Sequence, residues 1–135
     1  MSGLYVRVRV GAETYALSVE HVLEVSDLGE VAAVPGAPAS ALGVRNLRGQ
    51  VLPVFDLASV LGLSSQSPPA RLLVAEGPEH VVGLAIDDVT DVGPLPTERQ
   101  EADSELLSGS TLEDGVLVGV IDVPRLFEVL NEAAR

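Results

Sequence analysis

The amino-acid sequence predicts a mainly β protein made of two similar small lobes, with only short helices. Three observations support this prediction. Valine-rich runs bounded by glycine, proline and acidic residues recur along the chain. Helical periodicity is confined to short stretches. The chain also contains an internal duplication, in which apolar and acidic positions repeat after about 66 residues.

The length of the chain sets what kind of core it can form. A chain of 135 residues buries roughly 68% of its unfolded surface, which is enough for an apolar core without metals or disulfides. We therefore expect a single domain over residues 1–135. The sequence has no cysteine, which excludes thiol catalysis, zinc–cysteine sites and disulfide frameworks. No basic leader with an apolar run stands at the start, so we expect a cytoplasmic location.

The charge of the chain excludes several kinds of partner and chemistry. Eight basic residues, all arginine, stand against 20 acidic ones, for a formal net charge of -12. Binding to nucleic acid or to an anionic membrane needs a basic face, so neither is expected. The absence of lysine excludes a P-loop lysine and a Schiff base. The apolar runs are far shorter than the ~20 residues that a membrane-spanning helix needs.

The elements can be predicted in chain order. In the first strand, valines at 6, 8 and 10 alternate with Arg7 and Arg9, so we expect the valines in the core and the arginines in solvent. Short helices are expected after the N-cap residues Ser18, Asp56 and Asp122. Residues 81–86 and 116–121 read as strands, and Pro53 favours an edge or a bulge. Residues 64–69 read as a linker and residues 97–105 as a polar loop.

The duplication organises these elements into two lobes. Residues 15–25 align with 82–92, and residues 51–57 align with 117–123. Each copy ends with a strand, an aspartate cap and a short helix. The expected architecture is two small barrels of about five strands each, SH3-like or related, over approximately residues 4–63 and 71–128. Each lobe is too small to close a good core alone, so we expect the two to share one.

The sequence gives little support for catalysis or for a metal site. The two imidazoles, His21 and His80, stand far apart, and the acidic residues 87, 88 and 91 lack the spacing of a calcium loop. No Gly-x-Ser-x-Gly motif is present. The four aromatic residues are assigned to the core: Tyr5, Tyr15, Phe55 and Phe127. We expect no catalytic, cofactor-binding or metal-binding residues.

The segment 43–50, which carries two arginines and an asparagine between two glycines, is the most unusual one. One interpretation is a hairpin turn, for which Asn46 and Gly49 are well suited, with the arginines at its rim. In the other, Arg48 pairs with a carboxylate such as Glu24 and holds a defined surface that a partner can recognise.

These segments resemble the CheW family of chemotaxis coupling proteins. The resemblance runs in order through residues 15–17, 22–25, 34–38, 43–57, 82–89 and 115–122, so it covers essentially the whole chain. It implies two SH3-like barrels around a shared core, in agreement with the duplication. It also implies a non-catalytic adaptor that links the cytoplasmic tips of chemoreceptors to the regulatory domain of a CheA-type histidine kinase, without inserting into the membrane itself.

The resemblance further implies a receptor-binding groove between the barrels. The family roles carry over to Val22, Glu24, Gly43, Asn46, Leu47, Arg48 and Val89. A helical receptor tip would place apolar side chains in this groove, while Arg48 fixes the register through charge-assisted bonds. The alternative function is a small β-barrel regulatory module that binds a small ligand in the inter-lobe groove.

Overall fold

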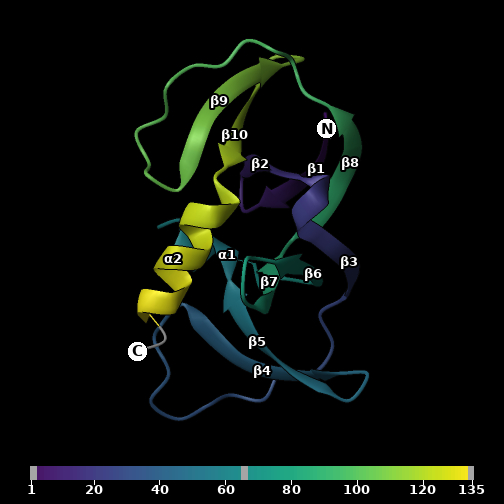
Figure 1. The fold of residues 1–135 in the computed structure, drawn as a ribbon, viewed down its shortest axis with the longest axis vertical. Coiled ribbons are helices and arrows are strands. Elements are labelled where there is room, and N and C mark those ends of the chain that lie inside the picture. Colours follow the sequence, from purple (N-terminus) through teal and green to yellow (C-terminus); the bar gives the residue numbers. More distant parts are fainter. Residues whose placement is uncertain (1–2, 65–66, 134–135) are drawn as a thin grey trace.

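In the computed structural model, which describes residues 3–64 and 67–133, the chain forms two five-stranded sheets and short helices (Figure 1). The elements, in chain order, are β1 (Leu4–Val10), β2 (Glu13–Ser18), the 3-10 helix η1 (Val19–His21), β3 (Val22–Asp27), β4 (Ala41–Leu47), β5 (Gln50–Asp56), α1 (Leu57–Val60), β6 (Arg71–Glu76), β7 (Val81–Ile86), β8 (Asp88–Pro94), β9 (Leu107–Glu113), β10 (Val116–Ile121) and α2 (Val123–Ala133).

The two sheets have the same internal arrangement. Sheet A has the strand order β8-β1-β2-β10-β9, and sheet B has the order β3-β6-β7-β5-β4. Neighbouring strands are antiparallel, except that β2 with β10 and β5 with β7 are parallel. Strands β1 to β5 correspond, in order, to β6 to β10 in the repeat. Exchanging each strand for its counterpart turns the strand order of one sheet into that of the other. The mainly β fold with two related five-stranded units is therefore confirmed.

The two sheets do not coincide with the two halves of the sequence. Sheet A combines β1 and β2 with β8, β9 and β10, and sheet B combines β3, β4 and β5 with β6 and β7. The expectation that residues 4–63 and 71–128 would form one lobe each is therefore wrong. The two halves exchange their first hairpins, because the short helix η1 leads the chain out of sheet A and directly into sheet B.

The core explains why the central strands are continuous apolar runs. Leu73 and Leu84 point into a core shared by both sheets. Their neighbours Leu72 and Ala85 point to the other face, into a second apolar cluster whose buried members all come from sheet B. Both faces of these strands are thus buried, so polar residues cannot alternate with apolar ones. The helix α2 lies along one side of the molecule and adds Leu126 to the shared core (Figure 1). Burial of each of these leucines contributes about 1.5–3 kcal/mol to the free energy of unfolding.

The aromatic residues follow the prediction for the most part. Tyr15, Phe55 and Phe127 are buried in the shared core, and Tyr5 is partly buried against the interior of sheet A. The three-residue turn of η1 and the four-residue α1 follow Ser18 and Asp56, but neither residue makes a side-chain cap bond. Asp122 does cap α2: its Oδ1 accepts a hydrogen bond from the backbone N–H of Arg125 at 3.1 Å.

The prediction for Arg7 is wrong, and the prediction for Pro53 is met only in part. Arg7 is only 6% exposed, because its guanidinium is enclosed by the ends of β8 and β9 and donates hydrogen bonds to Glu113 at 2.6 Å. Arg9 is half exposed as expected. Pro53 lies in β5, an interior strand rather than an edge, but it stands next to an irregularity in the pairing of β4 with β5. It is tolerated there because the pairing of β5 with β7 begins one residue later, at Val54.

The connections agree with the sequence where they can be compared. Residues 97–105 contain no strand, and this loop touches sheet A through an isolated bridge between Gln100 and Ser110. Of the expected linker 64–69, residues 65 and 66 lie outside the described residues. No helix within residues 3–64 and 67–133 has the length and apolar character needed to cross a membrane.

Candidate functional site

The hairpin of β4 and β5 carries the central part of the candidate site. Its turn consists of Arg48 at φ 50° and Gly49 at φ 85°. Two successive residues of positive φ give the turn that matches the right-handed twist of a hairpin. The backbone N–H of Gly49 donates a hydrogen bond to Asn46 Oδ1 at 3.0 Å. The hairpin interpretation of this segment is therefore confirmed, and Asn46 shapes the turn.

The second interpretation of this segment is also confirmed in its first part, because Arg48 pairs with Glu24. Nη2 of Arg48 donates a hydrogen bond to Oε2 of Glu24 on β3. Strands β3 and β4 are the two edges of sheet B, so the ion pair links one edge strand to the hairpin that carries the other. The side chain of Arg48 is 70% exposed and that of Glu24 is 28% exposed. The pKa of Arg48 is raised by the hydrogen bond and charge of Glu24.

An apolar pocket lies directly beside this ion pair. We call it the Arg48 pocket; its volume is about 310 Å³. Its walls include Leu47 from β4, Leu52 from β5 and Val74 from β6, together with Glu24 and Arg48 at the rim. Leu52 and Val74 belong to the interior of sheet B, whereas Leu23 at the pocket is 52% exposed. The pocket therefore opens from the surface onto the barrel interior.

The other predicted site residues lie elsewhere. Val22, at the start of β3, and Val89, in β8, are both partly buried against the shared core. Figure 1 shows β3 and β8 one above the other along the same side of the molecule. Neither valine lines the Arg48 pocket. The structure thus gathers Glu24, Leu47 and Arg48 at one pocket and places the two valines toward the junction of the sheets.

Gly43 has a backbone role. Its φ is +145°, and a Cβ at this position would lie 2.0 Å from the carbonyl oxygen of Ala32. Ala32 and Val44 form an isolated bridge with hydrogen bonds of 2.8 and 2.9 Å. Gly43 therefore lets the segment before β4 lie against that strand, and it acts on the Arg48 pocket only by holding β4 in place.

Sequence reasoning missed the apolar walls of this pocket. Leu23, Leu52 and Val74 read as ordinary strand residues, and nothing in their spacing sets them apart. Comparison of the two repeats offers a usable signal. Leu47 aligns with Glu113, and Val74 occupies in sheet B the place of Arg7 in sheet A. In sheet A, the Arg7–Glu113 ion pair fills this place. In sheet B, apolar side chains line the Arg48 pocket at the equivalent place.

The fold and the site together define a class of protein: a mainly β module of two interlocked five-stranded units, with an exposed ion pair beside an apolar pocket. Among solved structures, the scaffolding protein TtCheW from Thermoanaerobacter tengcongensis is similar, with a TM-score of 0.83, 26% sequence identity, and coverage of 95% of this chain and 94% of that one.

Sequence comparison points to the same family. The chain is 34% identical to the probable chemotaxis protein CheW of Rhizobium etli, over 93% of this chain and 88% of that protein. It is 30% identical to the chemotaxis protein CheW of Rhizobium meliloti, over 88% and 83% of the two chains. The CheW-like domain profile matches residues 4–131. The chain belongs to the CheW-like domain family.

Proposed function

We propose that this chain is a non-catalytic adaptor of chemotaxis signalling, which couples the cytoplasmic tips of chemoreceptors to a CheA-type histidine kinase. The relatives named as chemotaxis proteins and the structural relative named as a scaffolding protein support this function. The adaptor acts by binding alone. It works in the cytoplasm and reaches the membrane-bound receptor arrays only through its partners.

The observation that carries the proposal is the Arg48–Glu24 ion pair at the mouth of the Arg48 pocket. An exposed ion pair adds little to the stability of a fold, because water screens it. At an interface, the same pair can fix the register of a partner by charge-assisted hydrogen bonds. The pocket accepts an apolar side chain, which supplies binding free energy through burial.

The remaining predicted residues fit a surface that extends from this pocket. Val22 and Val89 offer partly buried apolar contacts toward sheet A, and Leu23 adds an exposed one next to the pocket. A helical receptor tip that lies along β3 meets Leu23 and Glu24 first. Asn46 and Gly43 hold the hairpin and the strand behind it.

The test measures binding of a chemoreceptor cytoplasmic fragment and of a CheA-type kinase fragment. The variant Arg48→Glu places two like charges together and is expected to weaken receptor binding at least tenfold, which corresponds to about 1.4 kcal/mol. Its melting temperature should stay within a few degrees of the wild-type value, because the pair is exposed. The double variant Arg48→Glu with Glu24→Arg restores opposite charges and is expected to recover much of the binding.

A matched control separates this site from a general loss of positive charge. Arg99 is also exposed but lies in the loop beside sheet A, so Arg99→Glu should leave receptor binding unchanged. Equal binding by wild type and Arg48→Glu would falsify the role of the ion pair. If the wild-type protein binds neither fragment, and a metabolite instead raises its melting temperature in a concentration-dependent way, the small-ligand alternative is correct.

A further inference from the structure

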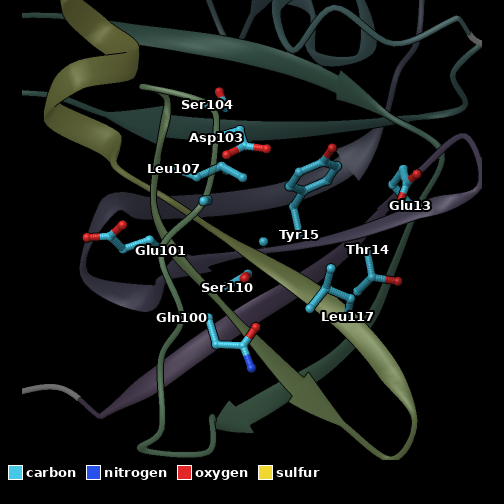
Figure 2. Close-up of a pocket in the computed structure, with 12 residues that line it drawn as sticks. Glu13, Thr14, Tyr15, Gln100, Glu101, Asp103, Ser104, Leu107, Ser110 and Leu117 are labelled. Carbon is cyan, nitrogen blue, oxygen red and sulfur yellow. The ribbon is translucent and has the colours of Figure 1, made fainter.

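A second pocket, on sheet A, is acidic (Figure 2). We call it the acidic pocket; its volume is about 400 Å³, and it lies between β2, β10 and the loop that precedes β9. Three carboxylates line it, from Glu13 at the start of β2 and from Glu101 and Asp103 in the loop. The pocket belongs to the opposite sheet from the Arg48 pocket and shares no residue with it.

The three carboxylates have no cationic neighbour of their own. No arginine lines the pocket, and within the described part of the chain none of Glu13, Glu101 and Asp103 takes part in an ion pair. By contrast, most described arginines are paired with other acids, as Arg7 is with Glu113. The negative charge around the pocket attracts a cation.

The hydroxyl of a buried tyrosine points into the same pocket. Tyr15 is only 9% exposed, and its hydroxyl makes no hydrogen bond to any described residue. Figure 2 shows the hydroxyl end of the ring directed toward the space between Asp103 and Glu13. Burial and the charge of Glu13 raise the pKa of this phenol. The hydroxyl oxygen itself is open to the pocket rather than enclosed, so a ligand that enters the pocket can hydrogen-bond to it.

The packing behind Tyr15 fixes its ring. A Cβ on Gly119 of β10 would lie 2.9 Å from the tyrosine ring, so the glycine is what allows the ring to lie this close to β10. Next to the pocket, β9 and β10 present Leu112 and Leu117 directly opposite each other, and these are 61% and 57% exposed. The pocket therefore combines acidic groups, an aromatic ring and an uncovered apolar rim.

We propose that the acidic pocket binds the side chain of an arginine or lysine presented by a partner protein. The cationic group lies between the carboxylates of Glu13 and Asp103 and against the Tyr15 ring, which attracts cations through its π face (Figure 2). The aliphatic stem packs on Leu107 and Leu117. The apolar rim selects a protein segment over a free amine, because residues that flank the cation cover Leu112 and Leu117, whereas a small amine leaves them exposed.

The composition of the pocket argues against other ligands. Three uncompensated carboxylates repel an anion, and the net charge of -12 excludes a nucleic acid. Within the described residues, no group of three or more histidine, aspartate or glutamate side chains lies close enough together to hold a metal ion. A guanidinium carries five N–H donors on one planar group, so it can bridge two carboxylates that are too far apart to coordinate one metal ion.

The experiment uses the complete chain and a defined peptide, acetyl-Leu-Arg-Leu-amide, followed by chemical-shift changes of backbone amides. We expect shifts confined to residues 13–15, 100–104 and 107–119, with binding in the millimolar range or tighter. The same peptide with neutral citrulline in place of arginine should bind at least tenfold more weakly. The double variant Glu13→Gln with Asp103→Asn should lose at least fivefold in affinity for the arginine peptide, and Tyr15→Phe should lose part of it.

The controls make each outcome decisive. Glu30 is an exposed acid on the segment between β3 and β4, so Glu30→Gln must bind the peptide as the wild type does. Equal affinity for the citrulline peptide, shifts elsewhere on the surface, or no shifts at millimolar peptide overturn the proposal. Binding of arginine amide alone as tightly as the tripeptide overturns the assignment to a protein side chain. A normal thermal unfolding curve for each variant shows that the fold is intact. Arg48→Glu should bind the peptide as the wild type does, because the Arg48 pocket shares no residue with the acidic pocket.

Discussion

At the scale of single residues, two glycines next to the same hairpin show how differently a backbone can depend on the missing side chain. Gly43 and Gly49 both have positive φ, at +145° and +85°. At Gly49 no atom lies within 4 Å of the position that a Cβ would occupy, whereas at Gly43 a Cβ would lie 2.0 Å from a backbone oxygen. The contact at Gly43 cannot be relieved by a side-chain rotation.

We therefore predict a large difference between two alanine variants. Gly49→Ala should cost about 1 kcal/mol of unfolding free energy, because alanine tolerates a left-handed conformation poorly. Gly43→Ala should cost at least about 3 kcal/mol, since the bridge between Ala32 and Val44 must also break. Urea denaturation of the two variants measures both values. Equal losses would contradict the assignment of Gly43 as the close-approach position.

The arginines show what a sequence pattern can and cannot predict about a residue. The pairing of Arg48 with Glu24 could be predicted, because an arginine in a glycine-bounded turn of a strongly acidic chain has carboxylates available to pair with. The burial of Arg7 could not be predicted from the sequence. Its alternation with Val6 and Val8 correctly places it on the opposite face of β1, but the burial of that face depends on the ends of β8 and β9, which are distant in sequence.

At the scale of elements, Arg7 and Glu113 tie three strands together. Arg7 on β1 donates hydrogen bonds to Glu113 on β9 at 2.6 Å and to the carbonyl of Pro94 on β8 at 2.5 Å. Strands β8 and β9 are the two edges of sheet A. The ion pair thus closes one end of this sheet, and its loss leaves a buried guanidinium with one fewer partner.

This arrangement predicts how stability depends on pH. Arg7 lowers the pKa of Glu113 below its ordinary value of 4.5. A carboxyl group whose pKa is lower in the folded protein stabilises the fold above its unfolded pKa, and this contribution is lost as the pH falls through the folded pKa. At neutral pH, Glu113→Gln should therefore be less stable by about 1–3 kcal/mol. As the pH falls below 4.5 and on through the lowered pKa of Glu113, the difference between the two proteins should shrink.

Urea denaturation between pH 7 and pH 3 measures this convergence. Glu79 is an exposed acid without a described ion-pair partner, so Glu79→Gln is the matched control and should follow the wild-type curve at every pH. A constant difference between wild type and Glu113→Gln across this range would show that the ion pair is not the source of the stabilisation.

At the scale of the whole molecule, the repeat predicts the architecture but not the connectivity. The aligned segments indicated the five-stranded units, the shared core and the terminal helices of each half. The exchange of hairpins could not be predicted, because the two copies carry the same apolar pattern and β1–β2 can fill the same place as β6–β7. The short η1, only three residues long, determines which sheet β3 joins, because it directs the chain from β2 into the other sheet. The Arg48 pocket depends on this exchange too, since Val74 comes from the second half and Leu47 from the first.

The exchange of hairpins leads to a prediction about fragments of the chain. If residues 1–65 and 66–135 are produced as separate polypeptides, the first lacks β6 and β7, which stand between β3 and β5 in sheet B, and the second lacks β1 and β2 from the middle of sheet A. Neither fragment can close a sheet or bury the shared core, so each should be unfolded alone. Mixing them should restore the native fold, because every strand then finds its partner. The measurement is the dispersion of backbone amide signals for each fragment and for the mixture. Lobes that followed the two halves of the sequence would instead fold independently, so a well-dispersed spectrum from either fragment as a monomer would contradict the exchanged topology.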